Sequence, residues 1–201
     1  MFAQAIFGKP KPKPFILTEI AMNDILESLG LPEIDRFIGD GGFGAVYSLE
    51  GGEMAVKLGD ITAYDVDGAI LASLDNIGPT IFAHGRVDDT TGYIVMERLS
   101  TTLSNTETLT RADVESLVQL YHKCMASFAG HGDLHDGNVM ARIRPDGTRE
   151  WLLIDWEFNY KSSIYRDEFW IYKEWEELFE KDVIPKIADA KTRKYAKRAL
   201  K

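Results

Sequence analysis

Lysine alternates with proline at the start of the chain, and a helical pattern of apolar residues follows. Residues 9–14 carry this alternation, which predicts an extended, solvated arm because proline cannot donate a backbone hydrogen bond. From Thr18 to Gly30 apolar residues recur at helical spacing, with Thr18 at the expected cap. Residues 1–36 are therefore predicted to form an N-terminal arm and a helix.

Patterns typical of strands dominate the next part of the chain. The segments rich in β-branched and aromatic residues are 45–49, 53–58, 80–86 and 93–99. Gly51-Gly52 joins the first two segments as a hairpin. One helix interrupts the series, starting at Asp60 or Thr62, with an apolar face. That face consists of Val66, Ile70, Leu71 and Leu74.

The second half of the chain is predicted to be mainly helical. Thr110 and Asp113 have the spacing of a capping box, and a long amphipathic helix follows them. Residues 139–143 and 150–154 are predicted to form two strands around a proline-glycine turn. A further helix begins at Arg166. Strands followed by helices are typical of an α+β protein.

Composition narrows the classes of protein to which the chain can belong. The net charge of -9 and the pI near 5.0 exclude a nucleic-acid-binding surface over the whole molecule. One cysteine, Cys124, excludes a disulfide framework and a thiolate zinc site. No apolar run is long enough to span a bilayer, and residues 1–8 are too short for a secretory signal. We expect a cytoplasmic protein without a membrane segment.

The basic C-terminal end is the exception to the acidic composition. Residues 186–201 are predicted to form a helix that carries most of the local positive charge. Its cations are Lys186, Lys191, Arg193, Lys194, Lys197, Arg198 and Lys201. Such a face is either simply solvated or a docking site for an acidic partner or RNA. Nucleic acid is otherwise not an expected partner.

Residues 131–138 contain the densest candidate chemistry. They read His-Gly-Asp-Leu-His-Asp-Gly-Asn and place Asp133 five residues before Asn138. An aspartate can orient an attacking hydroxyl and accept its proton, while an asparagine on the same loop can hold magnesium against phosphates. Part of the motif also resembles a metallophosphatase, whose two metals need more histidines than the four in this chain. His131 and His135 are then expected to be structural.

Residues 38–47 form a glycine-rich motif. Gly39, Gly41 and Gly44 occupy the G-x-G-x-x-G positions, and Val46 follows them. A dinucleotide-binding fold uses the same letters, but there the motif leads into a helix. Here it leads into a strand, a hairpin and a second strand that contains Lys57.

Taken in order, these motifs resemble the protein-kinase-like superfamily. The H-G-D-x-x-x-x-N loop and the run Ile154-Asp155-Trp156-Glu157 are similar to aminoglycoside phosphotransferases, and the short chain resembles small atypical kinases such as the RIO group. The resemblance runs from about Phe37 to Trp170. It implies a two-lobed α+β fold. The small lobe, residues 37–99, would be antiparallel strands with one helix, and residues 100–201 a reduced, mainly helical large lobe.

The resemblance also implies a role for each site residue. Lys57 would bind the α- and β-phosphates of ATP. Asp133 would be the base or hydroxyl-orienting group, and Asn138 and Asp155 would hold Mg²⁺ or Mn²⁺. Met96 would lie at the back of the adenine pocket, where backbone groups of the next residues bind the base. The residues implied to enclose ATP are Gly39, Gly41, Gly44, Val46, Met96, Glu97 and Leu99.

Two further acidic positions follow from the family pattern. Related kinases pair the strand lysine with a glutamate of the small-lobe helix, and this helix contains no glutamate. Asp65 and Asp67 are the candidates, and Asp67 fits the register better because Leu71 follows it at the expected spacing. Asp167 takes the place of an aspartate that braces the catalytic loop.

The implied function is ATP-dependent transfer of the γ-phosphate to a hydroxyl of a protein, on serine or threonine rather than tyrosine. The connector from Leu99 to Thr110 is short, and little sequence remains to enclose a small acceptor. Two alternatives stay open: a small-molecule phosphotransferase of the aminoglycoside or choline kinase type, and a catalytically inactive binding module with the same fold.

Overall fold

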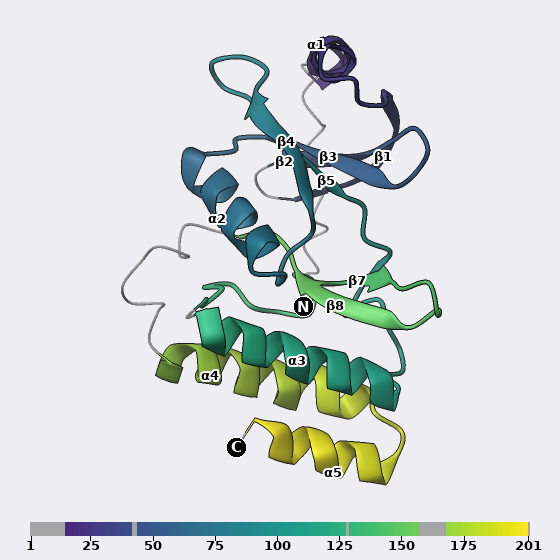
Figure 1. Ribbon diagram of the computed structural model, residues 1–201, viewed down its shortest axis with the longest axis vertical. Helices are drawn as coiled ribbons and strands as arrows, with labels where there is room; N and C mark the ends of the chain where they lie inside the picture. Colours follow the sequence, from purple (N-terminus) through teal and green to yellow (C-terminus); the bar gives the residue numbers. More distant parts are fainter. Residues whose placement is uncertain (1–14, 42–43, 128, 157–167, 201) are drawn as a thin grey trace, which may run out of the picture.

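The computed structural model of the protein describes residues 15–41, 44–127, 129–156 and 168–200. The predicted arm, residues 9–14, lies outside these ranges. Figure 1 shows two stacked lobes: a twisted sheet with helices α1 and α2, and below it a short sheet resting on helices α3, α4 and α5.

The small lobe is built on a five-stranded antiparallel sheet in the order β1-β2-β3-β5-β4. Its strands are β1 (Ile34–Gly41), β2 (Gly44–Leu49), β3 (Met54–Gly59), β4 (Ile81–Arg86) and β5 (Gly92–Glu97). Gly51 and Gly52 have positive φ angles of 83° and 76° in the β2–β3 turn, as a tight hairpin requires. The predicted hairpin is confirmed. The lobe begins with β1, before the predicted boundary at residue 37.

Helix α1 (Phe15–Ser28) covers the outer face of this sheet (Figure 1). Met22 and Leu26 are fully buried and share one apolar core with Tyr47 of β2 and Val56 of β3. Because side chains alternate along a strand, Lys57 then lies on the opposite, inner face. The helix begins before Thr18, so the expectation that this residue caps the helix is wrong.

Helix α2 (Ala63–Leu74) begins at a reciprocal capping box, as predicted for Thr62. The Asp65 N–H donates to Oγ1 of Thr62 at 3.3 Å, and Oδ2 of Asp65 accepts the Thr62 N–H at 2.7 Å. Two backbone donors of the first turn are thereby satisfied.

The predicted apolar face of α2 is wrong at Leu74, whereas Val66, Ile70 and Leu71 are partly buried and Leu71 packs against the core. Leu74 is 71% exposed, whereas Gly68 and Ala72 are buried. A Cβ added at Gly68 would lie only 3.1 Å from Cβ of Trp156. The helix therefore packs on the residues after β8 through small side chains, which allow a closer approach than leucine or isoleucine.

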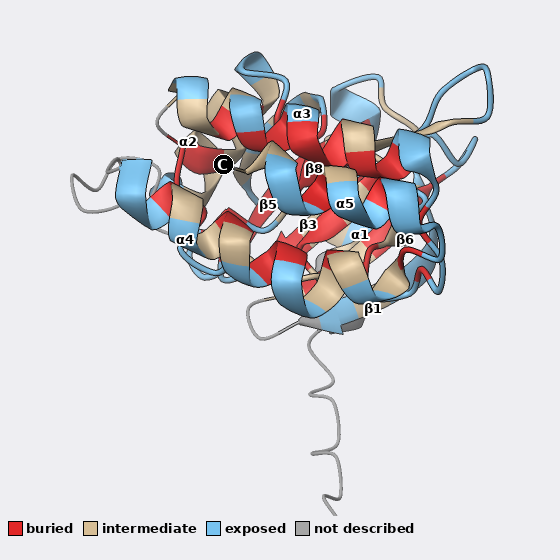
Figure 2. Ribbon diagram, turned by 90° about the horizontal axis from the view of Figure 1, so that it is seen from below, coloured by how far each residue is buried: buried red, intermediate tan, exposed pale blue. Residues whose placement is uncertain are grey.

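The large lobe combines a three-stranded sheet with helices. The sheet has the order β6-β7-β8, with β6 (Thr101–Thr102), β7 (Val139–Ile143) and β8 (Arg149–Leu153). The helices are α3 (Arg111–Ser127), α4 (Glu168–Leu178) and α5 (Ala190–Ala199), with a π-helical turn η1 (Phe179–Val183) and a 3₁₀ turn η2 (Ile184–Lys186) between the last two. Seen from the helix side, these helices are buried on their inner sides and exposed on their outer sides (Figure 2).

Asp113 anchors α3 to the large-lobe sheet. It forms the predicted capping box with Thr110, whose N–H and hydroxyl donate to Oδ2 of Asp113 at 2.8 and 2.7 Å. Asp113 is only 2% exposed, and it also accepts bonds from Arg149 at 2.7 Å and from the Trp151 indole at 3.2 Å. These donors satisfy a side chain whose burial without hydrogen bonds would be costly.

Helix α5 contains the predicted basic segment. It begins after Asp189, whose carboxylate accepts the Thr192 N–H at 2.7 Å, and it packs through Thr192 and Ala196. Its exposed cations are Lys191, Arg193, Lys194, Lys197 and Arg198. Docking of an acidic partner or RNA on this face stays a prediction.

The predicted α+β fold, with an antiparallel small-lobe sheet and a mainly helical large lobe, is confirmed. Within the described residues, the structure contains no helix with the length and apolar character that crossing a membrane requires.

Replacing Leu26 with alanine should lower the free energy of unfolding by roughly 2–5 kcal/mol, because it leaves a cavity between α1 and the sheet. Urea titration measures this change. Ile20→Ala on the same helix, at a position 57% exposed, is the control and should change the free energy by less than about 0.5 kcal/mol. Equal effects would contradict the packing of α1.

Candidate active site

A cleft of about 360 Å³ lies between the lobes, which is within the size range of small-molecule sites. Strands β1 to β3 form its small-lobe wall, and Thr102 and Met140 belong to its large-lobe wall. Of the residues predicted to enclose ATP, those that line this cleft are Gly39, Gly44, Val46, Met96, Glu97 and Leu99.

The glycine-rich motif forms the hairpin between β1 and β2. Gly41 pairs with Gly44 across this hairpin, at its tip, and is not among the residues that line the cleft. A side chain at Gly44 would collide with the carbonyl oxygen of Leu58, so β2 can approach β3 this closely only with glycine here. The tip itself, residues 42–43, is outside the described part of the chain.

The segment after β5 connects the lobes and lines one edge of the cleft. The Glu97 N–H donates to the carbonyl of Thr80 at 2.8 Å, and the Ser100 N–H to the carbonyl of Ala141 at 2.7 Å. Among the described residues, no hydrogen bond occupies the N–H of Leu99, which is buried at the cleft. Backbone donors are rarely left unpaired in proteins, so this N–H is available to a ligand in the cleft.

An ion pair closes the inner end of the cleft. The ammonium of Lys57, from β3, contacts Oδ1 of Asp155, which follows β8. Asp155 has a φ angle of 60°, in the left-handed region that non-glycine residues rarely adopt. Strained conformations of this kind cluster at active sites. The structure thus brings together two of the predicted site residues from different lobes.

The aspartate of helix α2 that lines the cavity beside Lys57 is Asp65, whereas Asp67 is the expected one. A small cavity beside Lys57 is lined by Asp65 and Ala69 of α2. Successive residues of a helix are about 100° apart, so Asp67 lies about 200° around the axis from Asp65. The ion pair that the structure shows for Lys57 is with Asp155, and pairing with Asp67 stays a prediction.

The loop that carries Asp133 and Asn138 is tied to the end of β8. Asn138 is 7% exposed, and its Nδ2 donates to the backbone carbonyl of Asp133 at 3.0 Å. Its own backbone carbonyl accepts the Ile154 N–H at 3.0 Å. These bonds place Asn138 next to the segment of Asp155, while the carboxylate of Asp133 is exposed.

Asp155 and Asn138 fit a magnesium ion. In the part of the chain that the structure describes, no group of three or more His, Cys, Asp or Glu side chains could hold a metal by itself. Mg²⁺ prefers oxygen ligands and is often bound by one or two protein groups plus substrate phosphates. Asp155 offers a carboxylate. Because Nδ2 of Asn138 is turned toward Asp133, its amide oxygen is the atom left for a ligand.

Glu174 of α4 is a site residue that the sequence pattern did not indicate. Its two carboxylate oxygens accept the N–H groups of His131 at 3.1 Å and Gly132 at 2.6 Å. Burial raises the pKa of Glu174, while these two donors favour its charged form. The sequence could have indicated that Glu174 faces the protein interior, because it follows the buried Ile171 by three residues and so lies on the apolar side of the helix.

Asp167, expected to brace this loop, lies outside the described residues. In the structure, the carboxylate that binds the loop backbone comes from Glu174, about two helix turns further along the chain.

His131 is a structural residue of the loop, as expected. It is 1% exposed, its Nε2 donates to the carbonyl of Ile154 at 2.8 Å, and its ring lies 4.8 Å from that of Trp156. Within the described residues, its Nδ1 has no hydrogen-bond partner. Burial lowers the pKa of His131, since protonation would add a charge and an unpaired donor to the core. His135 accepts the Gly137 N–H at Nδ1, at 3.0 Å.

No family model matches the chain, and no curated protein matches it in sequence. Among solved structures, the chain is similar to the structure of vaccinia related kinase 3 at 14% sequence identity, with a TM-score of 0.45. The match covers 63% of this chain and 47% of that one, so the chain matches about half the length of that kinase.

Glu174→Gln should speed amide hydrogen exchange at Gly132 by about tenfold, because one charge-assisted bond to the loop backbone is lost. Exchange measured by mass spectrometry or NMR tests this. Glu177→Gln, which alters only an exposed pair with Lys181, is the matched control and should leave the loop unchanged. Unchanged exchange in both variants would contradict the bracing role.

The lowered pKa of His131 predicts a loss of stability in mild acid. The unfolded histidine binds a proton near pH 6.5, whereas the buried one does so only at lower pH, so stability falls as the pH drops below about 6.5. Urea titrations at several pH values measure this slope. His131→Gln should flatten it, while His122→Gln, at an exposed position, should not. Identical slopes for all three proteins would show that His131 does not cause it.

Proposed function

We propose that the protein is an ATP-dependent phosphotransferase that transfers the γ-phosphate to a hydroxyl group. The observation that carries this proposal is the convergence of charged and polar groups from separate segments at one end of a nucleotide-sized cleft. Lys57 and Asp155 are 98 residues apart in sequence and form an ion pair there. Asn138 and Asp133 adjoin them on one loop.

ATP would lie with its adenine toward the connecting segment and its phosphates toward Lys57. The free N–H of Leu99 offers a donor to the edge of the base, and the aliphatic Val46 and Met96 line the same cleft. Lys57 is the cation available for the α- and β-phosphates. The pair with Asp155 holds its ammonium at this end of the cleft.

The transfer step forms a bond between the acceptor oxygen and the γ-phosphorus and breaks the bond to the oxygen that bridges the β- and γ-phosphates. Asp133 orients the acceptor hydroxyl and takes its proton, and ADP is released. Magnesium, held by Asn138 and Asp155, would supply charge neutralisation on the phosphates. Lys57 adds to this neutralisation, so most of the catalysis is positioning and electrostatic stabilisation.

The acceptor that we propose is a protein, with serine or threonine as the modified residue. The side chain of Asp133 is 56% exposed, so a bulky acceptor segment can reach it. The chain from Leu99 passes through a short strand and turns directly into α3, which leaves few residues to enclose a small polar molecule. An open site suits a segment that is already part of a folded or extended protein.

Asp133→Asn should lower turnover by about 10³-fold or more while leaving nucleotide binding and the unfolding temperature nearly unchanged, because it removes only the proton acceptor. Asp155→Asn and Lys57→Ala should also abolish turnover, the latter with weaker nucleotide binding. Transfer of labelled phosphate from ATP in a cell extract measures the rate. Asp89→Asn, in the exposed β4–β5 turn, is the control. A wild-type protein that binds ATP without turnover would instead be a binding module.

The acceptor class is tested by comparing two readouts for the same protein. ATP consumption is measured with a panel of aminoglycosides, choline and sugars, beside phosphate incorporation into generic protein substrates. Labelling of proteins without stimulation by the small molecules supports a protein kinase. Rapid turnover of a small acceptor with no protein labelling would overturn that assignment.

A further inference from the structure

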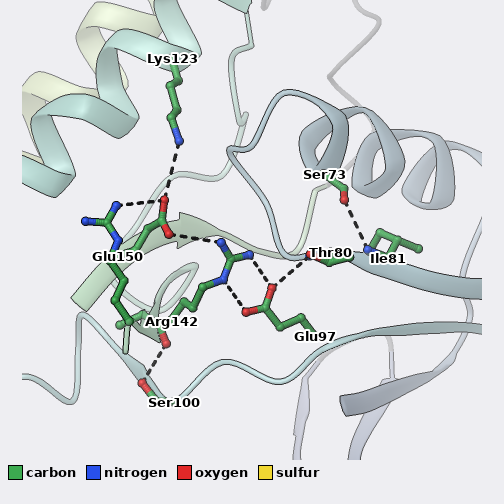
Figure 3. Close-up of polar contacts among 10 residues, drawn as sticks. Ser73, Thr80, Ile81, Glu97, Ser100, Lys123, Arg142 and Glu150 are labelled. Carbon is green, nitrogen blue, oxygen red and sulfur yellow. Dashed lines mark hydrogen bonds and ion pairs between the residues drawn. The ribbon is translucent and has the colours of Figure 1, made fainter. Parts of the chain in front are cut away.

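The side chain of Glu97 reaches from the connecting segment to the large lobe. Its backbone lines the cleft, while its carboxylate meets the guanidinium of Arg142 on β7 (Figure 3). Nε and Nη2 of Arg142 donate to Oε1 and Oε2 of Glu97, both at 2.5 Å. This is a bidentate, charge-assisted contact, which fixes both distance and orientation.

The contact is shielded from solvent. The side chains of Glu97 and Arg142 are 19% and 32% exposed. Hydrogen bonding to Glu97 raises the pKa of Arg142, in keeping with this contact. A pair of this kind is screened by salt less than a surface pair and is sensitive to the loss of either partner.

A second carboxylate holds Arg142 in place from the other side. Oε2 of Glu150, on β8, accepts a hydrogen bond from Nη1 of Arg142 at 3.2 Å (Figure 3). Glu150 also pairs with Arg144 at 3.3 Å. Nζ of Lys123 lies 3.9 Å from Glu150 and donates to the carbonyl of Asn76 at 2.8 Å. Arg142 is therefore bound by a carboxylate of each lobe, Glu97 and Glu150.

The small lobe holds the other end of the contact. The Thr80 N–H donates to Oε2 of Glu97 at 3.3 Å, and the Glu97 N–H donates to the carbonyl of Thr80 at 2.8 Å. Glu97 is thus tied to Thr80, the residue before β4, through its backbone and side chain, and to β7 through its side chain. A change in the angle between the lobes at this segment would break the bidentate geometry.

We infer that Arg142 is a positioning residue for nucleotide binding, acting through Glu97 on the segment that carries the Leu99 N–H. We call Glu97 and Arg142 the hinge clamp. The inference rests on the proposed function. The hinge clamp selects the lobe orientation in which the cleft has its observed shape, and the apparent affinity for ATP falls with the fraction of molecules in that orientation.

The experiment compares the affinity and kinetics of purified variants for ATP with magnesium. Arg142→Ala and Glu97→Gln should each raise the Kd and KM for ATP by about tenfold, the loss expected for a charge-assisted bond, with kcat changed by less than about twofold. Arg144→Ala is the matched control, since Arg144 lies on the same hairpin and, among the described residues, its ion pair is with Glu150 and not with Glu97. It should stay within about twofold of wild type.

A double-mutant cycle separates the hinge clamp from two unrelated effects. If both residues act through their mutual contact, Arg142→Ala should add less than about twofold to the Kd in the Glu97→Gln background. Fully multiplicative losses would overturn the inference. Equal effects of Arg142→Ala and Arg144→Ala in a wild type that binds ATP would also overturn it, while leaving the proposed function intact.

Absence of ATP binding by folded wild-type protein would overturn the proposed function and the inference together. If Arg142→Ala fails to fold, Arg142→Lys keeps the charge but loses the bidentate geometry, and it should still raise the Kd for ATP. An Arg142→Lys protein with wild-type Kd would overturn the inference.

Discussion

The ion pair between Lys57 and Asp155 is the contact on which the rest of the site depends, because it joins a small-lobe strand to the end of a large-lobe strand. Its side chains are 22% and 42% exposed, so solvent screens the pair and it adds little to stability. Backbone bonds hold the lobes together instead, such as the Leu153 N–H to the carbonyl of Ile77 at 2.7 Å. The charges are therefore available for a ligand, while the backbone bonds maintain the cleft.

Asp155 is held in its strained conformation by the residue before it. The N–H of Ile154 donates to the carbonyl of Asn138, and its carbonyl accepts Nε2 of His131. Both partners belong to the loop of Asp133. The carboxylate of Glu174 accepts two backbone N–H groups of the same loop. Asp133, Asn138 and Asp155 lie on irregular segments, whereas Glu174, which binds the backbone of the Asp133 loop, lies on helix α4. This division suits a site in which positioning and electrostatics do most of the chemistry.

Local features of the fold could be predicted from the sequence because they depend on residues three or four positions apart. The capping boxes at Thr62 and Thr110 each need one hydroxyl and one aspartate three residues later. The hairpin at Gly51 needs residues that accept positive φ. For the same reason the motif spacings pointed to Lys57, Asp133, Asn138 and Asp155 as the site residues that we propose, since each motif is short and contiguous.

The features that only the tertiary structure decided depend on contacts between residues far apart in the chain. The buried face of α2 is set by Trp156, so small Gly68 is inside and Leu74 outside, against the apolar pattern. The same rotation brings Asp65 rather than Asp67 toward Lys57. The contact between Glu97 and Arg142 spans 45 residues, and no local pattern specifies such a pair. The sequence by itself determined which groups we propose for the chemistry, because they lie in short motifs, whereas long-range packing decided which side chains support them.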